Sequence, residues 1–352
     1  MTPALRAGDR VLVTRLDYLG DVILSLPLVD AIRAHAPGVE VDYLSRRPGA
    51  DLLAGDARFA RVWALERGAG LAASLRLLHS LRERRYRAVI DLYANPRSAW
   101  LSLLSGAPVR VGTRRRARRR MYTHSVEPPP DVRAVTEQNL LHGAPIGVAA
   151  SATKPSLALS DAERDRARAR LAGVRAGRGS PLVGVHPGGK WEVKRWGPAS
   201  FAALAALARE RLGASVVVLI GPGEEAHAAR LREAAGESVA YLPVMPVRET
   251  AAVIAELDAM VVSDGGVAHL AVAVGTPTVA VFGSAEPDVW FPYEAFGPYR
   301  AALVPLQCRP CHAHVCPLGH TRCLTGLASE DVFGRLCEVL ALAGRGSSRE
   351  AT

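Results

Sequence analysis

The sequence lacks an apolar stretch near the roughly 18 uninterrupted residues that a membrane-spanning helix needs, so we expect no transmembrane helix. Residues 1–6 contain no apolar run followed by a small-residue cleavage site, which argues against a secretory signal. The composition excludes disorder as the main state, because 49% of the 352 residues are apolar and only 22% are charged. We therefore expect a cytoplasmic globular protein, and its length favours two domains.

Lysine is scarce, because only three of the 44 cationic side chains are lysines, and two of these, Lys190 and Lys194, lie in one short segment. The other cationic side chains are arginines, and they are unevenly distributed. Residues 1–176 hold 29 Lys and Arg against 17 Asp and Glu, a net charge of +12, whereas residues 177–352 hold 15 against 17, a net charge of −2. This asymmetry indicates that the first half meets a polyanionic partner.

The chain also lacks a Gly followed by four residues and Gly-Lys-Ser/Thr, the pattern with which many nucleoside triphosphatases hold phosphates. ATP hydrolysis of that kind is therefore not expected. The charge alone leaves nucleic acid, anionic lipid and phosphorylated sugar as candidate partners.

Short apolar segments alternate with helical periods along both halves, which predicts an α/β fold with parallel sheets. In the first half the pattern predicts strands at 11–14, 39–44 and 88–92, and helices at 21–35 and 71–85. In the second half it predicts strands at 182–185, 216–220, 260–262 and 279–282, and helices at 201–212 and 250–257. Ligands of such doubly wound sheets bind outside the carboxyl ends of the strands.

The domain boundary is expected in the glycine-rich segment 173–181, after a helix at 160–171 whose Ser160 and Glu163 have capping-box spacing. The expected domains are residues 1–175 and 176–330. A last amphipathic helix at 331–342 begins a C-terminal segment that ends at residue 352.

The first candidate motif is the loop 15–21 (RLDYLGD), between a predicted strand and helix. Asp21 begins the predicted helix, where an acid either caps the helix and favours its dipole or acts as a general base. Asp17 is a second candidate base, and Arg15 lies in the same loop.

The second motif is the segment 186–196 (HPGGKWEVKRW), which follows a predicted strand. Gly188 and Gly189 allow close approach of a ligand, and Lys190, Lys194 and an adjacent arginine supply charge for phosphate. This pattern favours a phosphate-binding loop over a solvated basic turn.

The third motif is the segment 262–269 (VSDGGVAH), a strand that leads through Gly265 and Gly266 into an apolar helix. This arrangement offers a helix N-terminus to an anion and places Asp264 and His269 beside it. His269 is either a core histidine or part of the site. The segment 221–225 (GPGEE) follows another strand and places carboxylates where ribose hydroxyls can be held.

Two clusters have competing interpretations. Seven arginines in eleven residues form either a solvated charge run or a contact with phosphates or anionic lipid. No aromatic residue is interleaved before Tyr122, which argues against binding of single-stranded nucleic acid. These arginines are Arg110, Arg114, Arg115, Arg116, Arg118, Arg119 and Arg120.

Four of the five cysteines fall within sixteen residues, at Cys308, Cys311, Cys316 and Cys323. In a cytosolic chain a structural zinc or iron site is favoured over disulfides, and reduced structural thiols are the other interpretation. The spacing is not that of a zinc ribbon with two paired knuckles. No metal is therefore assigned to these cysteines.

These motifs together resemble glycosyltransferase family 9, the ADP-heptose:lipopolysaccharide heptosyltransferases, over about residues 10–340. The resemblance is carried by Leu19-Gly20-Asp21, Lys194-Arg195-Trp196, the segments 221–225 and 263–269, and the late cysteines. The segment 308–323 is most similar to the heptosyltransferase II branch.

The resemblance implies a GT-B architecture, in which two Rossmann-like domains face each other across a cleft. The N-terminal domain would bind the acceptor, a lipid-anchored phosphorylated oligosaccharide, and the C-terminal domain the ADP-sugar. It implies Asp21 as catalytic base, Lys194 at the donor diphosphate, Glu225 at the ribose, and the segment 264–269 at the sugar and phosphates. An inverting transfer of heptose to the lipopolysaccharide core follows, without a required metal or further cofactor.

The acceptor contacts expected from the basic half are Arg15, Asp17, Arg114 and Arg115, with a peripheral location on the cytoplasmic face of the inner membrane and no nucleic-acid partner. Gly265 departs from the family, whose members commonly have Thr or Ser there. This leaves another nucleotide sugar or acceptor as an alternative. A non-catalytic protein that binds anionic glycolipid, and a nucleic-acid binder, are the alternatives of other classes.

Overall fold

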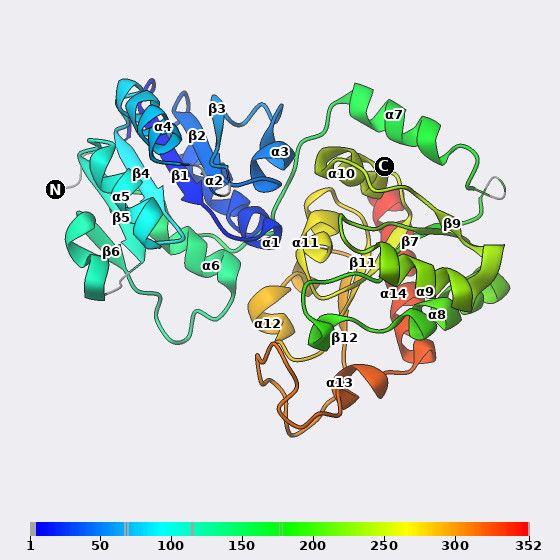
Figure 1. The fold of residues 1–352 in the computed structure, drawn as a ribbon. Helices are drawn as coiled ribbons and strands as arrows, with labels where there is room; N and C mark the ends of the chain where they lie inside the picture. Colours follow the sequence, from blue (N-terminus) through cyan, green and yellow to red (C-terminus); the bar gives the residue numbers. More distant parts are fainter. Residues whose placement is uncertain are drawn as a thin grey trace. The chain divides into compact units, whose positions relative to one another are not determined.

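The computed structural model describes residues 5–66, 68, 70–113, 116–175, 177 and 179–350. The chain divides into two compact units, Met1–Ala158 and Leu159–Thr352. Each unit contains one six-stranded sheet with helices packed against it (Figure 1). Every strand pair in both sheets is parallel, as the alternation of strands and helices predicts.

The boundary between the units differs from the one expected at 175, because the helix α7, Asp161–Leu171, belongs to the second unit. Ser160 and Glu163 do form the predicted capping box. Glu163 also pairs with Arg248 at the start of helix α10, Val247–Ala255, and Arg164 pairs with Glu256 just after it. These ion pairs join α7 to α10. The local sequence does not predict them, because the paired residues are far apart in the chain.

The sheet of the first unit has the strand order β3-β2-β1-β4-β5-β6. The chain runs outward from β1 through β2 to β3 and then returns to the other side of β1, so a topological switch point lies between β1 and β4. The strands are β1 Arg10–Arg15, β2 Glu40–Ser45, β3 Arg61–Ala64, β4 Ala88–Asp91, β5 Val109–Thr113 and β6 His124–Val126. The helices are α1 Leu19–Ile23, α2 Leu26–His35, α3 Gly49–Leu53, α4 Leu71–Glu83, α5 Pro96–Leu104 and α6 Val135–Leu140, with 3₁₀ turns at Arg116–Met121 and Leu141–Ile146.

The single helix predicted at 21–35 is two helices, α1 and α2, separated at Leu24 and Ser25. Pro27 lies in the first turn of α2, where its missing N–H costs no hydrogen bond, so the sequence favours a new helix start at this point. Ser25 stabilises the break, because its Oγ donates to the Val22 carbonyl and contacts the Tyr43 hydroxyl at 2.5 Å. Asp21 consequently lies within the first turn of a short helix.

The sheet of the second unit has the strand order β12-β11-β10-β7-β8-β9, with a switch point between β7 and β10. Helices α8 and α14 pack on one face, and α11 contacts β10 and β11. The strands are β7 Leu182–His186, β8 Ser215–Val218, β9 Ala240–Tyr241, β10 Ala259–Ser263, β11 Thr278–Val281 and β12 Tyr299–Ala302. The remaining helices are α8 Pro198–Leu212, α9 Glu225–Ala235, α11 Gly266–Ala273, α12 Pro287–Trp290, α13 Arg322–Thr325 and α14 Ser329–Glu350, with 3₁₀ turns at Glu192–Lys194, Gly236–Ser238 and Glu294–Phe296.

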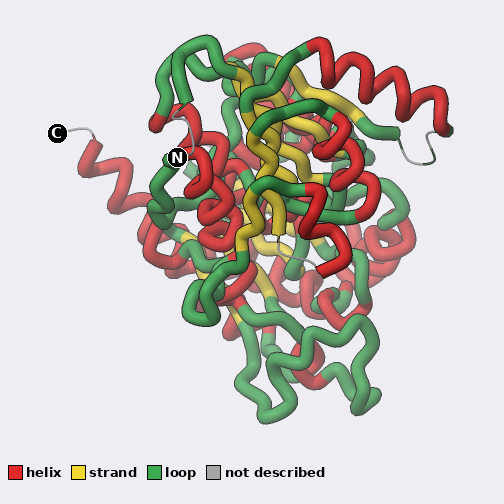
Figure 2. Tube along the Cα trace, turned by 90° about the vertical axis from the view of Figure 1, so that its left-hand side faces the viewer, coloured by secondary structure: helices red, strands yellow, loops and turns green. Residues whose placement is uncertain are grey.

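The C-terminal helix α14 is part of the second unit, because Val332, Leu336 and Val339 are buried with the strands and with α8. Residues 303–321 contain no helix or strand and form the orange loop beside α13 in Figure 1, which is green in Figure 2. This loop carries three of the clustered cysteines. No helix in the described part of the chain is long and apolar enough to cross a membrane.

Candidate functional site

The candidate residues of the first unit meet at the carboxyl end of β1. Arg15 ends the strand, and its guanidinium binds both carboxylates of the loop, Asp17 at 2.8 Å and Asp21 at 2.8 Å. It also donates to the Leu92 carbonyl, just after β4, at 2.6 Å. The cluster therefore lies at the topological switch point, where open α/β sheets bind their ligands.

One arginine binds both carboxylates, and both side chains are largely buried, with 11% of Asp17 and 14% of Asp21 exposed. The pKa of Asp17 is raised to about 6, chiefly by burial and also by the nearby charge of Asp21, although Arg15 opposes the rise. The side chain of Asp21 is 14% exposed, so it is accessible from solvent while paired. A carboxylate that is oriented by a guanidinium and accessible at one side is suited to accept a proton from a bound hydroxyl.

Asp91 is a buried carboxylate at the neighbouring strand end that the sequence analysis did not identify. Asp91 ends β4 and accepts hydrogen bonds from the hydroxyls of Thr14, at 3.0 Å, and Tyr122, at 2.7 Å. It also accepts from the backbone N–H groups of Tyr93 and Ala94. Asp91 thus joins β1, β4 and the segment after the arginine cluster.

The arginine cluster is described in part. Arg114 and Arg115, which were expected to contact the acceptor, lie outside the described residues. Arg110 donates to the carbonyls of Met121 and Ala107, so it stabilises the fold of this segment. Arg119 and Arg120 are exposed on the 3₁₀ turn.

In the second unit Lys194 and Asp264 form an ion pair, with Nζ 2.7 Å from Oδ2. Asp264 follows β10 and is 3% exposed, and burial raises its pKa although Lys194 lowers it. The Lys194 ammonium also lies over the rings of Trp191, at 5.5 Å, and Trp290, at 5.9 Å. Such a partly buried cation at the start of α11 is placed to meet a phosphate.

The two glycine motifs of this unit are joined by Glu224. Its carboxylate accepts hydrogen bonds from the backbone N–H groups of Gly189, at 2.9 Å, and Gly221, at 2.7 Å, and lies 3.0 Å from Nε2 of His186. Although burial opposes it, these contacts lower the pKa of Glu224 to about 2, with His186 as the main cause. A Cβ at Gly188 would lie 2.1 Å from this carboxylate, so the close approach requires glycine.

The neighbouring Glu225 was the residue expected at the ribose. It is exposed, begins α9, and lies 3.3 Å from the backbone N of Gly223. Glu224 and Glu225 are indistinguishable by sequence, but only Glu224 points into the fold. Glu225 is left accessible to a ligand.

His269 lies in α11 and is 4% exposed, with its Nδ1 3.3 Å from the Tyr293 hydroxyl. Burial, with a smaller contribution from Lys194, lowers the pKa of His269 to about 3. The imidazole is therefore neutral at physiological pH. It can form hydrogen bonds in the site without adding a positive charge.

This burial predicts a pH-dependent stability. The unfolded chain takes up a proton at His269 below its ordinary pKa of 6.5, whereas the folded protein does so only near 3, so acid favours unfolding. From about pH 8 to about pH 5, the free energy of unfolding of the wild type should fall about 2 kcal/mol more than that of His269→Gln. Urea unfolding across this range measures the difference, and parallel pH profiles for the two proteins would disprove the assignment.

The loop with the cysteines lies against the donor motifs. His314 stacks on Trp191, with ring centroids 4.2 Å apart and planes at 5°. The backbone N–H groups of Cys311 and His312 donate to the Ser284 carbonyl, which follows β11. The segment therefore packs beside Lys194, a placement that the cysteine spacing did not predict.

The cysteines themselves are free thiols, with Cys311 exposed and Cys323 buried. The backbone N–H groups of Thr321 and Leu318 are the main groups that lower the pKa of the Cys316 thiol. Within the described ranges no three His, Cys, Asp or Glu side chains are placed to hold a metal ion together. The metal interpretation of the spacing has no geometric support in these residues.

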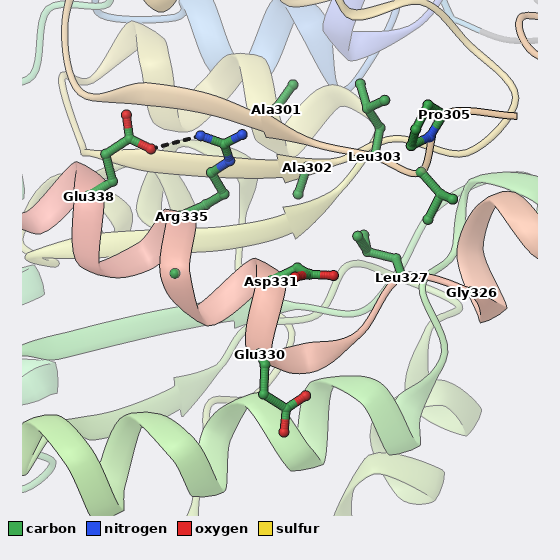
Figure 3. Close-up of a pocket in the computed structure, with 12 residues that line it drawn as sticks. Ala301, Ala302, Leu303, Pro305, Gly326, Leu327, Glu330, Asp331, Arg335 and Glu338 are labelled. Carbon is green, nitrogen blue, oxygen red and sulfur yellow. Dashed lines mark hydrogen bonds and ion pairs between the residues drawn. The ribbon is translucent and has the colours of Figure 1, made fainter.

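A cavity of about 790 Å³ in the second unit lies away from these motifs, between the end of β12 and α14 (Figure 3). Arg335 and Glu338, which line it, pair with each other at 3.0 Å. None of the candidate donor residues lines this cavity. The candidate sites are therefore the two clusters at the carboxyl ends of the sheets.

Comparison with known proteins supports a single family. The model of glycosyltransferase family 9 (heptosyltransferase) matches residues 74–322. The chain is 30% identical to lipopolysaccharide heptosyltransferase 1 of Pseudomonas aeruginosa over 325 residues, which cover 87% of each chain.

Solved structures show the same fold. ADP-heptose lps heptosyltransferase II of E. coli aligns with a TM-score of 0.80 at 21% identity, over 94% of this chain and 98% of that one. The E. coli heptosyltransferase WaaC with ADP-2-deoxy-2-fluoro heptose aligns with a TM-score of 0.72 at 22% identity, over 94% and 99%. The two Rossmann-like units thus match the GT-B structures of heptosyltransferases. The chain belongs to glycosyltransferase family 9, the heptosyltransferases, and is a glycosyl-transferring enzyme.

Proposed function

We propose that the protein transfers a heptose from ADP-heptose to the inner core of lipopolysaccharide, with inversion at the anomeric carbon. The observation that carries this proposal is the Lys194–Asp264 pair at the start of α11, since an ammonium held there by a buried carboxylate suits a diphosphate leaving group. Relatives named as lipopolysaccharide heptosyltransferases support the donor and acceptor classes.

The second unit binds the donor in this proposal. Lys194 and the backbone N–H groups of Gly265 and Gly266 stabilise the negative charge that develops on the diphosphate as the bond to the anomeric carbon breaks. Gly188 and Gly189 let the backbone approach the nucleotide, Glu225 holds the ribose hydroxyls, and neutral His269 packs near the sugar. No metal is needed for charge neutralisation in this scheme.

The first unit binds the acceptor. The Asp21 carboxylate takes the proton from an acceptor hydroxyl as its oxygen attacks the anomeric carbon, and ADP leaves from the opposite face. Arg15 orients Asp21 through Nη2 and binds Asp17 through Nε. Arg114 and Arg115 would add charge for the phosphates of a lipid-anchored core oligosaccharide. Binding such an acceptor would hold the enzyme peripherally on the cytoplasmic face of the inner membrane.

The test is acceptor-dependent release of ADP. ADP-L-glycero-D-manno-heptose is incubated with heptose-deficient lipopolysaccharide, and ADP formation is followed with and without the acceptor. Release that requires both substrates supports the proposal. If the protein binds ADP but forms none from ADP-heptose, the proposed donor site would stand, and other sugars or acceptors would have to be tested.

Gly265 gives a more specific prediction about the donor. Its φ of 171° is extended, and the nearest atom to an added Cβ, the Ser263 carbonyl oxygen, lies 3.9 Å away. A Cβ therefore fits here, and Gly265→Thr should fold normally and bind ADP-heptose about tenfold more tightly, since one charge-assisted hydrogen bond contributes about 1.5 kcal/mol. Calorimetric titration with ADP-heptose and ADP measures the gain.

The matched control is Gly188→Ala, where a Cβ would collide with the Glu224 carboxylate. This variant should lose affinity for both ligands. A Gly265→Thr variant that binds ADP-heptose no better, or more weakly, would contradict the placement of the donor at this position.

A further inference from the structure

Helices α4 and α5 of the first unit carry an exposed apolar surface. Of the ten large hydrophobic side chains that are exposed in the described residues, four lie on these two helices. They are Leu71, 77% exposed, Leu75, 55%, Trp100, 52%, and Leu104, 40%, and we call them the apolar ridge.

The two helices lie side by side and run in the same direction. Near their N-termini Arg97 of α5 donates to the Ser74 hydroxyl of α4 at 2.7 Å, and near their C-termini Arg82 of α4 donates to the Leu104 carbonyl at 3.0 Å. Leu71 and Leu75 are four residues apart, as are Trp100 and Leu104, so each pair forms a stripe on one helix face. The two stripes are therefore neighbours.

These side chains are not needed to fill the core. Other positions on α4 and α5 supply Leu81 and Leu101, which are buried in the core with residues of the sheet. The ridge thus leaves large apolar side chains in water after the core is complete, which is typical of a surface that binds a partner or a membrane.

A strongly basic cavity lies at the C-terminal end of the ridge. It measures about 470 Å³ and is lined by Arg10, Arg82, Arg85 and Arg87, which we call the arginine cavity. Asp9 is the single acidic residue among those that line it, and Arg10 is paired with Glu40 at 2.8 Å. The positive charge is thus compensated only in part and is available to an anion.

A second set of arginines lies beside α5. The 3₁₀ turn Arg116–Met121 contacts this helix, and Arg119 and Arg120 are exposed on it. The ridge therefore has cationic groups on two sides.

We propose that the apolar ridge and the arginine cavity together form a face that docks on an anionic phospholipid bilayer. Leucine and tryptophan side chains enter the boundary between headgroups and acyl chains, while guanidinium groups bind lipid phosphates. The combination of apolar stripes with only partly compensated arginines matches this surface better than it matches a second copy of the chain, whose own first half is equally basic. The inference rests on the proposed function in one respect, since a lipid-anchored acceptor requires an enzyme at the membrane.

The experiment is flotation of the full-length protein with vesicles of phosphatidylcholine alone and of phosphatidylcholine with an equal part of phosphatidylglycerol. The wild type should bind only the anionic vesicles. Leu71→Ser with Leu75→Ser should weaken this binding at least about tenfold. Arg82→Gln with Arg85→Gln and Arg87→Gln should weaken it about a hundredfold.

Matched controls come from the second unit. Val315→Ser with Leu318→Ser removes two apolar side chains that are 80% and 60% exposed, and Arg166→Gln with Arg209→Gln and Arg230→Gln removes three exposed arginines. Both controls should bind vesicles like the wild type. The ridge variants should also release ADP at the wild-type rate with a delipidated, water-soluble acceptor.

Equal binding by ridge, cavity and control variants would overturn the proposal, as would binding that ignores vesicle charge. The ridge would instead be a self-association surface if the wild type is a dimer, the Leu71 and Leu75 variant is a monomer, and neither protein binds vesicles. If the wild type releases no ADP with the water-soluble acceptor, the proposed function is contradicted. The vesicle-binding result does not depend on that outcome.

Discussion

Replacement of Asp21 by Asn is expected to lower kcat by about 10² to 10⁴-fold, the usual contribution of a general base, while the affinity for ADP stays unchanged. The asparagine amide has nearly the same shape as the carboxylate and cannot accept the acceptor proton. Since Asp21 and the donor residues lie in different units, ADP binding has no reason to change. Initial rates of ADP release and calorimetric ADP titration measure the two quantities.

The matched control is Asp17→Asn, because Arg15 binds Asp17 and Asp21 at the same distance. The loss of rate should be much smaller for Asp17→Asn if Asp21 is the base. Since burial raises the pKa of Asp17 to about 6, the pair should take up a proton as the pH falls through this value, and kcat/KM of the wild type should fall with it. A larger loss in Asp17→Asn than in Asp21→Asn would reverse the assignment of the base.

The second large effect is expected for Lys194→Met, which should lose both catalytic rate and stability. Without the ammonium, the leaving diphosphate loses its main cation, and a loss of about 10² to 10³-fold in kcat is expected. The variant also leaves the buried Asp264 carboxylate without its ion-pair partner, which typically costs about 3–5 kcal/mol of stability. Part of this cost is avoided if Asp264 takes up a proton, since burial already raises its pKa.

Two variants separate the catalytic loss from the stability loss. Lys190→Met removes a lysine from the same loop that also lies over Trp191, and rate and stability should change much less than in Lys194→Met. Lys194→Met combined with Asp264→Asn removes both charges and should recover most of the stability without recovering the rate. Recovery of the rate in the double variant would show that Lys194 acts on the fold and not on the leaving group.

Local patterns predicted the fold class well, because strand and helix periods depend on neighbouring residues. The strands β1, β2, β4, β7, β8, β10 and β11 lie close to their predicted positions, and the capping box of α7 is confirmed. The edge strands β3, β6, β9 and β12 and the inner strand β5 were missed. They have few residues each, and their apolar pattern is too brief to stand out from a loop.

The sequence by itself determined the alternation of strands and helices, and hence which loops emerge at the carboxyl ends of the strands with Asp21, Lys194 and Asp264 on them. Only the tertiary structure decided which of these residues meet. Lys194 reaches Asp264, Glu224 rather than Glu225 joins the two glycine motifs, and His314 stacks on Trp191. The physical reason is that these contacts join residues far apart in the chain, and strand order and loop path set them, whereas a local pattern reports only the periodicity of one element.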